Sequence, residues 1–374
     1  MKGGILIAMI NSYSSIGEIQ SLVRSLEPKS RKMFDDIYDV KVYSGAGNFS
    51  PDISSSIKSE FGSLEAVRSQ RIIKISNKVM SHSVTYNPIF DVRIEKGGDV
   101  LNPVDTNFHS NDFVDDPSTH MAAGSITDPD PFDQITGEHS VVTGALVKAD
   151  VFHGLLAPIM RDASPFSDYV KDYLRTAWRW IRAAHAYDEA AVYPLVVWNA
   201  KFPHLVDAGQ HLEQMQLFLG KGNHYSAIEK DRQGASLYKD GVQKYFGDLF
   251  LIHEALGLGY SKRETQTFVN LTPSFSGSEV VILSNGNPEA MIEETCRVFD
   301  ICRDNFTSEP FGFSMTSPPL GAVADQWSGF PSMARFTVPD ESVALRFGFN
   351  GIDIYGQPVI TRDPFVLARR LSSN

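Results

Sequence analysis

Four basic side chains recur at a regular spacing in the segment 164–187, whose pattern predicts a long helix. Lys171, Arg175, Arg179 and Arg182 occupy positions i, i+4, i+8 and i+11, so they lie along one side of that helix, opposite its apolar side. Each Arg offers a forked donor to phosphate oxygens. The row therefore predicts a surface for a nucleic-acid backbone. The alternative is a solvated face whose cations pair with neighbouring carboxylates.

A second basic group belongs to the segment 63–80, which we also expect to be helical. Arg68, Arg71, Lys74 and Lys78 lie beside an apolar stripe in this segment. Two basic helices could line one groove that holds nucleic acid. Two separate solvated faces are the competing interpretation, because nothing in the sequence shows that the segments meet.

An acidic segment offers a different chemistry. Between Gly97 and Val147 there is no Lys or Arg and there are nine Asp or Glu residues. Oxygen and imidazole ligands can hold a divalent ion, which would suit a metal-dependent hydrolase. No HExxH or calcium-loop spacing occurs, so a solvated or partner-facing loop is the alternative, and no metal ligand, catalytic residue or cofactor is assigned. The candidate ligands are His109, Asp112, Asp115, Asp116 and His120.

Composition limits the class of protein. The chain has 374 residues, 42% of them apolar, and a net charge of −11. Setting the nine acidic residues aside leaves −2, so basic surfaces elsewhere remain compatible with the total. Apolar runs are too short for a membrane span of roughly 20 residues. The spacing of the two cysteines matches no disulfide framework, which favours the cytoplasm, or a virion if the protein is viral.

The apolar periodicity predicts an α+β fold that is mainly α-helical. We expect core helices at 164–187, 204–219 and 241–256, and strands at 82–95 and 279–284 and over the last forty residues. Four regions are predicted. They are an N-terminal α+β region (1–96), the acidic irregular segment (97–138), a helical core (139–262) and a C-terminal α+β region (263–374).

These features favour a self-assembling structural protein, namely a viral nucleocapsid or capsid subunit that packages nucleic acid. Its partners would be further copies of itself and, through the basic rows, nucleic acid, but no membrane. Long segments without periodicity would be ordered at less net cost against neighbouring copies. One alternative is an intracellular enzyme, in particular a metal-dependent hydrolase that uses the His- and Asp-rich segment. A second is a protein-binding scaffold that binds no nucleic acid.

Overall fold

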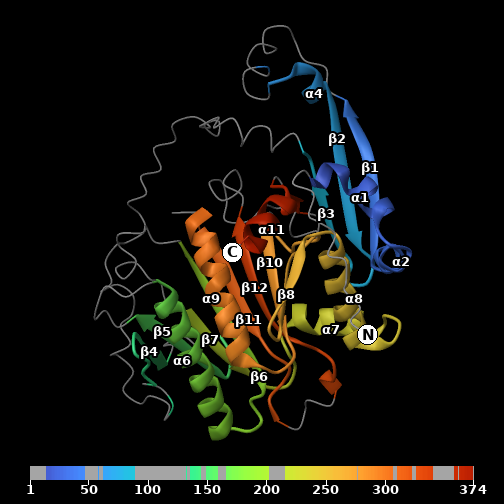
Figure 1. The fold of residues 1–374 in the computed structure, drawn as a ribbon. Helices are drawn as coiled ribbons and strands as arrows, with labels where there is room; N and C mark the ends of the chain where they lie inside the picture. The colour runs from blue at the N-terminus through green and yellow to red at the C-terminus, as the bar shows by residue number, and fades with distance from the viewer. Residues whose placement is uncertain are drawn as a thin grey trace, which may run out of the picture.

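The computed structural model describes most of the chain outside the acidic segment and several connections. The described residues are 14–46, 58, 62–88, 132, 135–144, 149–158, 166–201, 215–275, 277–305, 310–321, 326–339, 358–360 and 362–373. Two β-sheets and the helices packed on them make up this part (Figure 1). No helix among these residues is long and apolar enough to cross a membrane.

The smaller sheet has the strand order β1-β2-β3-β13. Strands β1 to β3 are antiparallel, and β13 adds to β3 in parallel. Residues from both ends of the chain therefore share one sheet, with η1, α1 and α2 beside it (Figure 1). The bounds are Ile16–Glu18 (η1), Ile19–Ser25 (α1), Pro28–Ile37 (α2), Tyr38–Ala46 (β1), Ser69–Asn77 (β2), His82–Tyr86 (β3) and Val359–Ile360 (β13).

The helix expected at 63–80 is wrong for most of its length. Only α4 (Leu64–Arg68) is helical, with the Ser63 hydroxyl accepting a hydrogen bond from Ala66 N–H at its N-terminus. Strand β2 follows at once and buries Ile73 and Ile75 on one face. A period of two, together with β-branched residues, explains the strand.

The larger sheet has nine strands in the order β4-β5-β7-β6-β11-β12-β10-β9-β8, and every neighbouring pair is antiparallel. The bounds are Ser140–Gly144 (β4), Phe152–Pro158 (β5), Tyr193–Lys201 (β6), Met215–Gly220 (β7), Gly259–Lys262 (β8), Thr265–Val269 (β9), Gly277–Ser284 (β10), Pro310–Thr316 (β11) and Ser332–Pro339 (β12).

Helices α6 (Phe166–Tyr187) and α9 (Pro288–Asn305) lie side by side across one face of this sheet (Figure 1). Phe336 of β12 faces α9, where its ring centroid lies 4.8 Å from that of Phe299. Alternation turns the neighbouring Arg335 to the opposite face. On that opposite face the large sheet meets α7 (Ser226–Ser236), α8 (Gly241–Ala255) and the small sheet. Helix α11 (Pro364–Ser372) is the last element that the structure describes.

The expectation of a mainly helical fold is therefore wrong: the protein is a sheet-rich α+β fold. The segment 204–219, expected to be helical, ends in β7, where Met215, Leu217 and Leu219 are buried and alternate with Gln216 and Phe218. A short apolar run such as that of β7 fits both a strand and a buried helix, because periodicity alone cannot separate the two. The strand expected at 279–284 is confirmed as β10. The expected strand pattern after Pro339 falls largely outside the described residues.

Candidate ligand-binding site

The basic residues of α6 lie on its outer side, as expected, and its apolar side is buried. Two of the four make specific contacts with neighbouring elements. Arg175 forms an ion pair with Glu289 of α9, and Arg179 donates a hydrogen bond to the carbonyl of Thr136 at 3.1 Å. Lys171 and Arg182 complete the row and have no partner of this kind among the described residues. Half of the row thus ties α6 to its surroundings.

The second basic group does not form a single row. Arg68 lies on α4, while Arg71 and Lys74 point to opposite faces of β2 because they are three positions apart in a strand. Lys78 lies in the turn after β2 and donates to the carbonyl of Asp35. Strand β2 and helix α6 lie in different parts of the molecule (Figure 1). The structure thus does not bring the two basic groups into a common groove.

The His- and Asp-rich segment, His109 to His120, lies outside the described residues. Within the part of the chain that the structure describes, no group of three or more His, Cys, Asp or Glu side chains is arranged to hold a metal ion. The described residues therefore supply no metal site of their own.

A polar cleft of about 520 Å³ opens beside α7. This volume falls within the range of roughly 300–1,000 Å³ that small-molecule sites occupy. Helix α7, the loop before it, the first residue of β6 and the turn before β12 form its walls. The lining residues are Tyr193, Gly222, Asn223, His224, Ser226, Glu229, Lys230, Arg232, Gln233, Gln326 and Trp327.

Two cations of α7 reach this cleft. Lys230 is exposed and makes no ion pair with any residue that the structure describes. The guanidinium of Arg232 lies over the ring of Trp327, 5.1 Å from its centroid, and its Nε donates to Glu229 Oε2 at 3.1 Å. The side chain of Arg232 is still 24% exposed, so it is partly accessible from the cleft that it lines. Trp327 itself is buried beneath it.

The imidazole of His224 forms the floor of the cleft and is held neutral. Burial lowers the pKa of His224 to about 4. Its Nδ1 accepts a hydrogen bond from Tyr225 N–H at 2.9 Å, so Nε2 carries the proton and donates to the Ser317 carbonyl at 3.3 Å. Both ring nitrogens are engaged, so this histidine is no free general base.

The remaining lining groups are amides and backbone. Asn223, Gln233 and Gln326 are exposed, and each side-chain amide can donate and accept a hydrogen bond. Gly222 has a φ of +84°, which a residue with a Cβ rarely adopts, and the Tyr193 hydroxyl donates to its carbonyl at 3.0 Å. This turn shapes the rim of the cleft next to Asn223.

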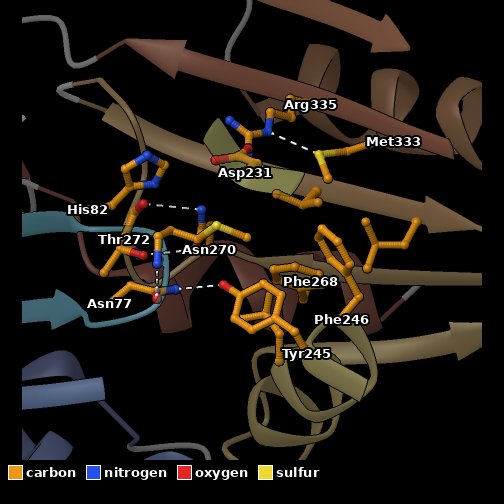
Figure 2. A pocket seen from close by; sticks show the side chains of 14 residues that line it. Asn77, His82, Asp231, Tyr245, Phe246, Phe268, Asn270, Thr272, Met333 and Arg335 are labelled. Atoms are coloured by element: carbon orange, nitrogen blue, oxygen red, sulfur yellow. Dashed lines mark hydrogen bonds and ion pairs between the residues drawn. The ribbon is translucent and has the colours of Figure 1, made fainter. Parts of the chain in front are cut away.

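A second, smaller cavity of about 30 Å³ lies where the small sheet, α7 and α8 meet the large sheet (Figure 2). Arg335 and Asp231 lie on one side of it, and Asn77 donates to the Tyr245 hydroxyl at 2.9 Å on another. This space accommodates one or two water molecules but no larger ligand. The open cleft is therefore the better candidate for a ligand site.

No protein-family model and no curated protein matches the sequence. Among solved structures, an ADP-glucose phosphorylase from Arabidopsis thaliana is 12% identical over 63% of this chain and 81% of its own, with a TM-score of 0.46. A uridylyltransferase is 12% identical over 64% and 85%, with a TM-score of 0.45. A yeast Ap4A phosphorylase in complex with AMP is 11% identical over 92% and 96%, with a TM-score of 0.34.

The prediction of a nucleocapsid or capsid subunit is wrong: the similar solved structures are named as a GalT-like protein, a uridylyltransferase and phosphorylases, and not as structural or viral proteins. With TM-scores below 0.5, the likeness carries no argument about what this chain binds.

Proposed function

We propose that the chain binds a nucleoside phosphate in the cleft beside α7. The observation that carries the proposal is the pairing of two cations with different roles. Arg232 presents a planar guanidinium backed by Trp327, and Lys230 presents an ammonium without an ion-pair partner among the described residues. A guanidinium plane stacks on aromatic rings, and an ammonium attracts phosphate oxygens.

The other lining groups fit the same ligand class. The three exposed amides can form hydrogen bonds with the edges of a base or the hydroxyls of a ribose, because each offers donors and an acceptor. The walls are predominantly polar, which suits a phosphorylated ligand better than an apolar one.

The described cleft residues support binding rather than acid–base catalysis. His224 uses both nitrogens within the protein, and Glu229 accepts from His224 N–H and from Arg232. A general base needs a free acceptor within reach of the proton it removes. We therefore assign the cleft a binding role and name no catalytic residue.

Isothermal titration calorimetry of the full chain with AMP, ADP and ADP-glucose tests the proposal; the names of the structural neighbours suggest these probes. We expect AMP to bind more tightly than adenosine or ribose 5-phosphate, because each of these lacks one of the two recognised groups. Binding should weaken as salt is added, since the phosphate contact is screened.

Lys230→Ala should lower the affinity for AMP by about tenfold, the effect of losing one charged hydrogen bond. Its matched control is Lys29→Ala, because Lys29 is exposed on α2 and does not line the cleft. Equal AMP affinities for the wild type and Lys230→Ala would place the phosphate elsewhere. The absence of any nucleotide binding at millimolar concentration would refute the proposed function.

A further inference from the structure

Helix α7 carries both cations of the cleft, yet it has little apolar anchorage. Of its eleven residues only Asp231 and Ala235 are buried. Asp231 lies between Lys230 and Arg232 in the sequence and turns inward while they line the cleft. A buried carboxylate costs free energy unless it is paired, so the partner of Asp231 decides how firmly α7 is held.

That partner is Arg335 of β12, whose Nη2 donates to Asp231 Oδ2 at 2.9 Å. Arg335 is itself held from several sides, as Figure 2 shows in part. Its Nε points to the sulfur of Met333 at 3.2 Å, its Nη1 donates to the Ser274 hydroxyl at 3.3 Å, and Nη1 lies 3.8 Å from Glu279 Oε1. The guanidinium is thus a fixed point of the large sheet, to which α7 is tied.

A second contact sets the distance of α7 from the β2–β3 turn. A Cβ built on Gly234 would lie 2.7 Å from the Val79 carbonyl oxygen, so only glycine permits this approach. The ion pair and the close contact are three residues apart, about one helical turn. Together they restrict both rotation and sliding of α7.

We propose that the Asp231–Arg335 ion pair is the positioning device of the cleft, and that it places Lys230 and Arg232 for phosphate and base. This inference rests on the proposed function. Asp231 and Arg335 are positioning residues, because they act on the ligand through their neighbours. A shift of α7 by one ångström misplaces both cations at once, and ligand contacts depend on such positions.

The experiment compares Asp231→Asn with Glu294→Gln in the full chain. Glu294 of α9 forms a similarly buried pair with Arg297, with Arg297 Nη2 2.7 Å from Glu294 Oε1, and neither residue lines the cleft. Both changes weaken a buried ion pair by replacing a carboxylate with an amide of similar shape. Three quantities are measured for each variant: the thermal midpoint, the AMP affinity, and the hydrogen-exchange rates of individual backbone amides.

For Asp231→Asn we expect an AMP affinity lower by about tenfold and exchange at least tenfold faster in residues 226–236, with β10 unchanged. Arg335→Lys keeps the charge but loses the forked geometry, and should give an intermediate effect. Glu294→Gln should lower the thermal midpoint and leave the AMP affinity at the wild-type value. Saturating AMP should slow exchange in α7 of the wild type.

Wild-type affinity and exchange in Asp231→Asn would overturn the proposal. So would a uniform rise in exchange, since that indicates a loss of global stability only. If the wild type binds no nucleotide, the proposed function fails by itself. Faster exchange confined to α7 would still support the anchoring, and uniform exchange would refute it.

Discussion

Glu294 is a buried carboxylate whose partners come from two strands and its own helix. Its Oε1 accepts from the Tyr260 hydroxyl at 2.7 Å and from the Thr267 hydroxyl at 3.0 Å, and Arg297 completes the set. Burial raises the pKa of Glu294, but the hydrogen bonds from Arg297 and Tyr260 outweigh it, so the net shift is downward.

A lowered carboxyl pKa stabilises the folded protein above the unfolded value of 4.5, and this contribution is lost as the pH falls through the folded pKa. Glu294→Gln should therefore be less stable than the wild type at pH 7, and the difference should shrink below pH 4.5. Urea unfolding at pH 7 and at acid pH measures it. A difference that does not vary with pH would show that the charge of Glu294 is unimportant.

Gly154 of β5 leaves room for the ring of Trp180 on α6. A Cβ at this position would lie 2.9 Å from two ring carbons of Trp180 and 3.0 Å from Val142 Cγ1. Gly154→Ala should destabilise the fold by about 1–3 kcal/mol, the usual effect of overpacking. The matched control is Gly247→Ala in α8, where a Cβ meets nothing within 4 Å, and alanine should stabilise by up to about 1 kcal/mol. Thermal unfolding compares the two, and equal effects would contradict the packing argument.

The residues of the cleft were not predictable from local motifs. Lys230 and Arg232 belong to a polar helix, whose charges in a sequence suggest only a solvated face. Trp327 lies about a hundred residues after Arg232 in the sequence, and only the fold places its ring under the guanidinium of Arg232. The one local signal of a ligand site in the sequence was the glycine-containing turn at 220–223, followed by a cluster of charged residues at 229–232. The row on α6 was predictable as a surface, because the apolar periodicity of that helix is strong.

At the scale of elements, the prediction succeeded for two long helices and for the short strand expected at 279–284, which is β10, and failed at 215–219 and over most of 63–80. Helices α6 and α8 lie close to their expected positions. In the segment 63–80 the spacing of Ile72, Ile75 and Val79 fits a helical stripe, whereas the burial of Ile73 and Ile75 in β2 follows a period of two. Because the two patterns share Ile75, the choice depends on pairing with β1, which lies more than twenty residues earlier, and with β3, which follows after a short turn.

Asn77 joins the small sheet to the rest of the molecule. Its Oδ1 accepts from the N–H groups of Val79 and Met80, each at 3.0 Å, and its Nδ2 donates to Tyr245 of α8. Asn77→Ala should lower the free energy of unfolding by about 2–3 kcal/mol, since it leaves buried polar groups without partners. The control Ser83→Ala removes one partly buried hydroxyl contact with Ser76 and should cost less than about 1 kcal/mol. Urea unfolding measures the stability of both variants, and similar losses of stability would contradict a joining role for Asn77.

At the scale of the whole molecule, the two ends of the described chain pack together. The Asp363 carboxylate at the start of α11 accepts hydrogen bonds from the N–H groups of Ile16, at 2.8 Å, and Phe365, at 2.9 Å. Arg369 donates to the Ser14 carbonyl, and the core is continuous between the sheets. The large sheet takes strands from both sides of residue 262, where a boundary was expected. The regional boundaries, self-association and cytoplasmic location stay predictions.

Two buried histidines couple the stability of the whole fold to pH. His253 donates from Nδ1 to the Leu249 carbonyl at 2.7 Å and accepts at Nε2 from Leu271 N–H at 3.3 Å. A second proton would break the latter contact, just as protonation of His224 would break the contact with Tyr225 N–H. Burial lowers the pKa of both His253 and His224 to about 4.

The unfolded chain binds these protons at about pH 6.5, whereas the folded chain binds them only near pH 4. The free energy of unfolding should therefore be highest above pH 6.5 and decrease as the pH falls from 6.5 to 4. The expected loss at pH 5 is on the order of 2 kcal/mol for each histidine. Burial raises the pKa of Asp363, which acts in the opposite direction, so a variant must isolate the histidine. His253→Gln should unfold more easily at pH 7.5 but lose less stability on acidification to pH 5. Urea unfolding at pH 7.5, 6 and 5 measures how the free energy of unfolding changes with pH in the wild type and in His253→Gln. An equal pH dependence in the two proteins would show that His253 does not contribute to it.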